Sequence, residues 1–173
     1  GLDATSDFDK DGKAELTVEK GQLFGAIAAA KTQDDIDAVL DTDAYNEIDD
    51  QFAISYLLKS KEKLNTKAIY AAPFLNSRSC SAKDGMEKSY DEILNLLSLM
   101  GKDGYAPVFK GSEDYLKDEK TYYPSDACDA IISIAKKYSS TNPLYVVAIG
   151  AITNVASALI KDPSIAENIV IVW

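Results

Sequence analysis

From Ala38 onward, the chain alternates short apolar runs with longer segments whose apolar residues recur every three or four positions. The short runs have the apolar and β-branched character of buried strands, and they cover 38–43, 67–74, 106–111, 144–150 and 168–173. The longer segments have the spacing of amphipathic helices and cover 49–60, 85–101, 125–139 and 151–163. This alternation predicts an α/β fold: an open, mostly parallel sheet with helices on both faces.

The helical segment 49–60 carries a dense set of apolar side chains. The pattern predicts that these side chains lie largely along one side of the helix, and they are Phe52, Ile54, Tyr56, Leu57 and Leu58. The segment 125–139 is expected to begin at Ser125 or Asp126, because both residue types favour helix N-termini.

Residues 1–37 differ from the rest and are predicted to form an N-terminal extension. The stretch DFDKDGKAEL has alternating acids whose oxygens suit Ca²⁺, and these are Asp7, Asp9, Asp11 and Glu15. It resembles the calcium loops of EF-hand, dockerin and integrin-type repeats. The integrin-type loop fits better, because Val18 stands where an EF-hand requires a bidentate Glu. The two interpretations of this stretch are a calcium-binding loop and a solvated acidic turn.

A second group of acids follows the first predicted strand of the domain 38–173. The stretch VLDTDAYNEIDDQFA contains five carboxylates, and these are Asp41, Asp43, Glu47, Asp49 and Asp50. The carboxyl ends of parallel strands share one edge of a sheet, and Asn76 and Ile149 are expected to reach the same edge. Crowded carboxylates repel one another, and a bound divalent cation relieves that repulsion. We therefore expect Ca²⁺ at this edge.

The composition limits the partners. The 173 residues are 46% hydrophobic and 27% charged, which suits a globular domain, and the formal net charge is −10. This charge repels nucleic acids and anionic membranes, and no apolar run approaches the roughly 20 residues of a membrane span. We expect neither partner. Cytoplasmic and secreted or periplasmic locations, the latter with a signal removed, remain equally open.

Three stretches together resemble the nucleoside hydrolases of the inosine-uridine preferring type, which are metal-dependent N-ribohydrolases. DTDAYNEIDD keeps the acid pairs of that family's Asp-x-Asp-Pro-Gly-x-Asp-Asp signature, but it replaces Pro-Gly and inserts two residues. APFLNSRS places Asn76 where the family has an Asn that contacts ribose, and LYVVAIGAITNVASALIKDPSIAENIVIV is similar to a later family block. The resemblance covers roughly 38–173 and implies the Rossmann-like fold of the family.

The resemblance also implies a metal site. By position, Asp43 and Asp50 would bind Ca²⁺ with the backbone oxygen of Ile149, and Asp41 would support these ligands from behind. Asp43 would also take a proton from a metal-bound water.

Two further residues, Asp49 and Asn76, would bind the hydroxyls of a ribose or ribonucleoside. The implied reaction is Ca²⁺-dependent hydrolysis of a ribonucleoside to ribose and free base, in which carboxylates stabilise positive charge on the sugar. Thr153 and Asn154 are interpreted as landmarks for packing and helix capping.

The chain also departs from the family. Family members are nearly twice as long, and their later half supplies a further metal-binding Asp and often a His, whereas this sequence has no histidine and stops at Trp173. We expect a truncated chain whose activity alone is open. We also expect either a homo-oligomer or completion by a missing C-terminal half.

Two other functions fit part of the pattern. A strand that ends in Asp-x-Asp also resembles the haloacid dehalogenase-like phosphatases, but Tyr45 stands where they usually have Thr or Val, and the pair Asp49 and Asp50 stays unexplained. The third function is a non-catalytic calcium-binding module, which would use both acidic clusters for structure or adhesion.

Overall fold

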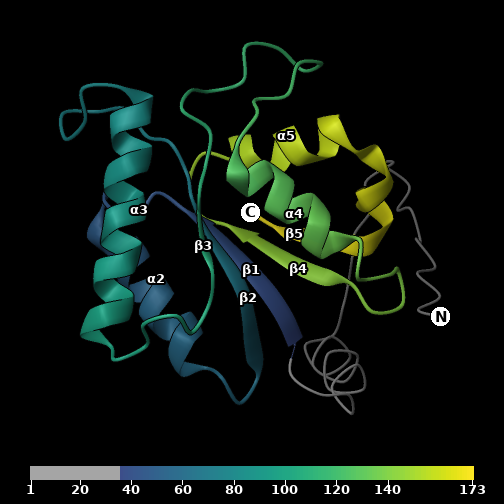
Figure 1. Ribbon diagram of the computed structural model, residues 1–173, viewed down its shortest axis with the longest axis horizontal. Helices are drawn as coiled ribbons and strands as arrows, with labels where there is room; N and C mark the ends of the chain where they lie inside the picture. Colours follow the sequence, from purple (N-terminus) through teal and green to yellow (C-terminus); the bar gives the residue numbers. More distant parts are fainter. Residues whose placement is uncertain (1–35) are drawn as a thin grey trace, which may run out of the picture. The chain divides into compact units, whose positions relative to one another are not determined.

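The computed structural model describes residues 36–173, and within them one five-stranded parallel sheet forms the centre of the fold (Figure 1). The strands are β1 (Ile36–Thr42), β2 (Leu64–Ala71), β3 (Val108–Lys110), β4 (Leu144–Ala148) and β5 (Ile169–Val172). Their order in the sheet is β3-β2-β1-β4-β5, and every neighbouring pair is parallel. The order reverses between β1 and β4. In open α/β sheets, ligands bind at such a switch point.

Helices cover both faces of this sheet. The helices are α2 (Ile48–Lys59), α3 (Ala82–Leu99), α4 (Asp126–Ala135), α5 (Thr153–Lys161) and the 3₁₀ helix η2 (Pro163–Asn168). In Figure 1, α2 and α3 lie on one side of the strands, and α4 and α5 lie on the other. The predicted α/β fold with a parallel sheet is therefore confirmed. The predicted elements are present, with ends shifted by a few residues.

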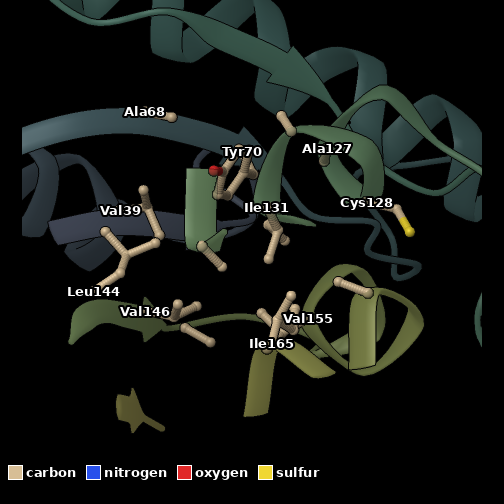
Figure 2. Packing of buried hydrophobic residues seen from close by; sticks show 14 residues of the cluster. Val39, Ala68, Tyr70, Ala127, Cys128, Ile131, Leu144, Val146, Val155 and Ile165 are labelled. Carbon is tan, nitrogen blue, oxygen red and sulfur yellow. The ribbon is translucent and has the colours of Figure 1, made fainter. Parts of the chain in front are cut away.

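Alternate residues of the central strands supply two separate cores. Val39 and Tyr70 pack with α4, α5 and β4, and Figure 2 shows them in one cluster with Ile131. The intervening residues Leu40 and Ile69 pack with α2 and α3. Because successive strand side chains point to opposite faces, a strand covered on both faces reads as a nearly continuous apolar run.

Helix α2 has one buried and one exposed side. Ile54, Leu57 and Leu58 are buried, whereas the side chains of Phe52 and Tyr56 are 70% and 74% exposed. The expectation that these apolar residues largely share one helical side was wrong for Phe52 and Tyr56. Side chains two residues apart on an α-helix point about 200° away from each other, so Phe52 and Tyr56 both point away from Ile54.

Backbone hydrogen bonds join the first residues beyond the strands. The Ala72 N–H donates to the Thr42 oxygen at 2.8 Å, and the Ile149 N–H donates to the Asp41 oxygen at 2.9 Å. These bonds extend the pairing of β1 with both neighbours to the end of the sheet. The segments that follow β1, β2 and β4 therefore begin at one edge.

Some expectations fall outside this structure. The acids of the N-terminal stretch, Asp7 to Glu15, lie outside the described residues, as does nearly all of the extension predicted for 1–37. In the part of the chain that is described, no helix combines the length and the apolar character needed to span a bilayer.

Candidate functional site at the carboxyl ends of the strands

Asp41, the next-to-last residue of β1, is completely buried. Its Oδ1 accepts a hydrogen bond from Asn154 Nδ2 at 2.8 Å, and its Oδ2 has no hydrogen-bond partner. Burial, with a smaller contribution from the charge of Asp43, raises the pKa of Asp41 to about 7, although the Asn154 bond opposes the shift. A phosphatase nucleophile must be ionised and accessible, so this environment disfavours the haloacid dehalogenase-like interpretation.

Asn154 connects the ends of several strands. Besides Asp41, its Nδ2 reaches the Ala71 oxygen at 3.2 Å, and its Oδ1 accepts the Ser112 N–H at 2.8 Å. Asn154 is therefore packed as expected, but it does not cap α5, whose N-cap is Ile152 without a side-chain bond. The Asn154 side chain also explains the glycine at position 111, because a Cβ atom there would lie 2.5 Å from Asn154 Nδ2 and 2.0 Å from the Ala71 backbone oxygen.

Asp43 and Asp50 form a nearly buried pair of carboxylates. Their exposed fractions are 7% and 6%. Burial and the neighbouring Asp43 carboxylate together raise the pKa of Asp50 to about 8. The pair therefore favours uptake of a positive charge, either a proton or a cation.

The local sequence explains how these two acids meet. A tight turn follows β1, in which the Asn46 N–H donates to the Asp43 backbone oxygen at 2.7 Å. Helix α2 then begins, with Asp49 and Asp50 in its first turn, where the helix dipole favours negative charge. Asp50 points into the protein, while Asp49 remains exposed beside it.

Asn76 reaches the same edge through Asn46. Asn76 is exposed in the segment after β2, and its Nδ2 donates to Asn46 Oδ1 at 2.5 Å. Asn46 in turn donates its Nδ2 to Asp43 Oδ2 at 2.9 Å. The sequence did not identify Asn46 as a site residue. The only signal for it was its place between the two acid pairs of the family signature.

The backbone after β4 lies against Asp43. A Cβ atom at Gly150 would be 2.6 Å from Asp43 Oδ1 and 3.1 Å from the Asp43 backbone nitrogen. The residue before it, Ile149, is the one whose N–H bonds to Asp41. The structure therefore brings Asp41, Asp43 and the Ile149–Gly150 backbone together.

The candidate ligand atoms at this edge are carboxylate and backbone oxygens, which suit a hard divalent cation. Within residues 36–173, however, no three Asp, Glu, Cys or His side chains come close enough to surround an ion. Two carboxylates and backbone oxygens would supply only part of the six to eight ligands that Ca²⁺ takes. The side chains present would therefore supply only part of the ligands of a hard divalent cation.

Two surface hollows of about 740 and 420 Å³ lie elsewhere. The larger is lined by residues such as Lys67, Phe109 and Tyr138, and the smaller by residues such as Met86 and Tyr123. Neither is lined by the carboxylate pair. The site is located by its chemistry rather than by the size of a cavity.

Comparison with known proteins found a matching family model and similar solved structures. The family model for inosine-uridine preferring nucleoside hydrolase matches residues 38–173. Among solved structures, a purine-preferring ribonucleoside hydrolase from Gardnerella vaginalis is 25% identical with a TM-score of 0.58, over 77% of this chain and 46% of its own. A plant nucleoside hydrolase is 23% identical with a TM-score of 0.56, over 80% and 48%. The chain thus spans about half the length of these two structures. A search of curated proteins found no significant match.

Proposed function

The chain belongs to the inosine-uridine preferring nucleoside hydrolase family, and from this membership we propose that its site serves the Ca²⁺-dependent hydrolysis of a ribonucleoside to ribose and free base. The observation that carries the proposal is the nearly buried pair Asp43 and Asp50 at the switch point of a parallel sheet. Burying two like charges side by side is costly unless a positive charge accompanies them.

The proposed cation ligands come from this pair and from the backbone beside it. Asp43 and Asp50 would hold Ca²⁺ together with the backbone oxygen of Ile149, and Asp41 would stay behind them, held by Asn154. When bound, Ca²⁺ supplies a positive charge that lowers the pKa of a nearby water.

The side chains of the site would then have different roles in the reaction. Asp43 accepts the proton of the water that attacks the sugar carbon of the N-glycosidic bond. General-base assistance of this kind contributes typically ~10²–10⁴ in rate. The negative charge of the site also stabilises the positive charge that develops on the ribose ring. Asp49 and Asn76, both exposed, bind the ribose hydroxyls.

The replacement Asp43→Asn tests this proposal. In the presence of Ca²⁺, the wild-type chain should release free base from inosine or uridine, and the variant should lose about 10²- to 10⁴-fold in kcat, because it lacks the general base. Chromatography of the released base measures both. Asp37→Asn is the matched control, because Asp37 lies near the opposite end of the same strand and bonds to Asn65 and Tyr138.

Two results would count against the proposal. One is equal activity of Asp43→Asn and Asp37→Asn. The other is a wild-type chain that cleaves a phosphomonoester but no nucleoside, which would favour the phosphatase alternative.

A further inference from the structure

We infer that Asn46 is a positioning residue that holds the proposed base, Asp43, and the proposed ribose ligand, Asn76, in a fixed arrangement. The inference rests on the proposed function and deepens it, because it assigns a role to a residue that lies between the two acid pairs of the family signature.

Asn46 contacts Asp43 through both its backbone and its side chain. The backbone N–H of Asn46 donates to the backbone oxygen of Asp43 at 2.7 Å, and this bond closes the turn between β1 and α2. The side-chain Nδ2 of the same residue donates to Asp43 Oδ2 at 2.9 Å. The other carboxylate oxygen, Oδ1, faces Gly150. Both oxygens of Asp43 therefore have defined surroundings, and Asn46 defines one of them.

Asn46 also contacts Asn76 through its side-chain oxygen. Asn76 Oδ1 accepts the backbone N–H of Arg78 at 2.8 Å, so its Nδ2 is the atom left to face Asn46. Asn46 therefore presents its oxygen to Asn76, at 2.5 Å, and its amide hydrogens to Asp43. A backbone N–H thus sets the orientation of two side-chain amides in succession.

Asparagine is the residue type that both contacts of position 46 require. The position needs a donor and an acceptor on one short planar group, and among side chains of this length only asparagine provides both. An aspartate here would place an oxygen against the Asp43 carboxylate, and alanine would leave both partners free to rotate. Displacing a base lowers kcat, whereas displacing a sugar ligand mainly raises KM. Asn46 should therefore affect both constants through its bonds to Asp43 and Asn76.

The test compares Asn46→Ala and Asn46→Asp with Asn65→Ala and Asn65→Asp. Asn65 is a matched control, because its Nδ2 donates to the Asp37 carboxylate at 2.8 Å, the same kind of bond in the first residues of β2. With inosine and saturating Ca²⁺, the Asn46 variants should lose about 10- to 100-fold in kcat and gain several-fold in KM. The Asn65 variants should change both constants by less than about twofold.

A double-mutant cycle adds a measurement that a merely structural role would not move. If Asn46 acts on the sugar through Asn76, the KM of Asn46→Ala/Asn76→Ala should be no higher than that of Asn76→Ala alone. Full additivity of the two KM effects would contradict the inference.

Failure of the inference and failure of the proposed function give different results. Wild-type kcat and KM in Asn46→Ala, with a normally active wild-type chain, would overturn the inference alone. A lowered melting temperature with unchanged kinetic constants would overturn it equally. A wild-type chain that neither binds nor hydrolyses nucleoside would contradict the proposed function itself, and the inference would fall with it.

Discussion

Three aspartates at the end of β1 and the start of α2 have different surroundings despite their common chemistry. Asp41 is completely buried and held by Asn154, with one oxygen unpartnered. Asp43 accepts a bond from Asn46, and Asp50 lies close enough for Asp43 to raise its pKa. These differences support the proposal that Asp41 braces the site while Asp43 and Asp50 bind a ligand, and these roles stay predictions.

The contact between Gly150 and Asp43 makes a prediction at the residue scale. A Cβ atom at Gly150 would lie 2.6 Å from Asp43 Oδ1, so Gly150→Ala must displace the carboxylate. We expect at least about a tenfold loss of kcat, because displacements near 1 Å can cost ~10²-fold in rate. We also expect about 1–3 kcal/mol of destabilisation from overpacking. Nucleoside hydrolysis and urea unfolding measure the two effects.

Gly101→Ala is the control for this substitution. Gly101 has φ +62° and open space around a Cβ position, so alanine there is strained without touching the site. It should lower stability by about 1–2 kcal/mol and leave kcat unchanged. Unchanged hydrolysis in Gly150→Ala would show that Asp43 is not held against this backbone.

The sequence predicted the acids of the candidate site, but not the bonds that Asn46 and Asn154 donate to them. Asp41, Asp43 and Asp50 stand out because carboxylates rarely follow a buried strand so densely. Asn46 and Asn154 act through hydrogen bonds to residues distant in the chain, such as Asn76 for the former and Ser112 for the latter. Asparagine is common in turns and at helix starts, so its type alone does not predict such a contact.

At the scale of elements, α2 is the clearest case of a correction. Its inward residues Ile54, Leu57 and Leu58 are buried, while Ile48, Phe52 and Tyr56 recur every four residues along the exposed side. The sequence concealed this division, because apolar residues occupy both sides of the helix.

The two sides of α2 predict unequal costs of truncation. Ile54→Ala should destabilise the chain by about 2–5 kcal/mol, because Ile54 is fully buried. Phe52→Ala should cost less than about 1 kcal/mol, because that side chain is 70% exposed. Urea unfolding of both variants provides the comparison. An equally large loss in Phe52→Ala would mean that the outer side of α2 is covered in solution.

Element boundaries were less predictable than the elements themselves. Helix α3 begins at Ala82, three residues before its predicted start at Gly85, and Ser81 caps it by accepting the Asp84 N–H at 3.0 Å. Glycine weakens the helical signal, yet Gly85 is required because a Cβ atom there would collide with the Phe74 backbone. By contrast, Ser125 is the N-cap of α4, and it was one of the two residues predicted to begin this helix.

Across the whole molecule, the parallel sheet brings Asp41, Asp43 and Asp50 to one edge, in a chain that already carries a net charge of −10. The parallel sheet and its two layers of helices were predictable from the alternation of apolar patterns alone. The chain spans about half the length of the two solved structures described above. Completion by a further segment, oligomerisation and calcium binding by residues 7–15 stay predictions.

The raised pKa values predict how stability varies with pH in the absence of calcium. Asp41 and Asp50 have pKa values of about 7 and about 8, against 3.8 ordinarily, so between about pH 4 and pH 8 the folded chain binds more protons than the unfolded chain. The free energy of unfolding should therefore fall as pH rises through this range. For fully buried Asp41 the fall is at most about 1.4 kcal/mol per pH unit up to pH 7.

Urea unfolding with a chelator, at several pH values, measures this dependence. Asp41→Asn should flatten the slope, because an amide does not titrate. Stability that rises with pH across this range would contradict the proposed protonation of the buried acids.

The central claim is that Asp43 and Asp50 together hold a divalent cation, and calorimetric titration with Ca²⁺ near neutral pH tests it most directly. The chain should carry Asp9→Asn and Asp11→Asn, so that the N-terminal acids do not contribute, and buffers of different ionisation enthalpy reveal any released protons. Because Asp50 has a pKa of about 8, Ca²⁺ should displace a proton on binding. Binding with proton release that disappears in Asp50→Asn is the predicted result. Absence of binding, or equal binding by Asp50→Asn, would contradict the account.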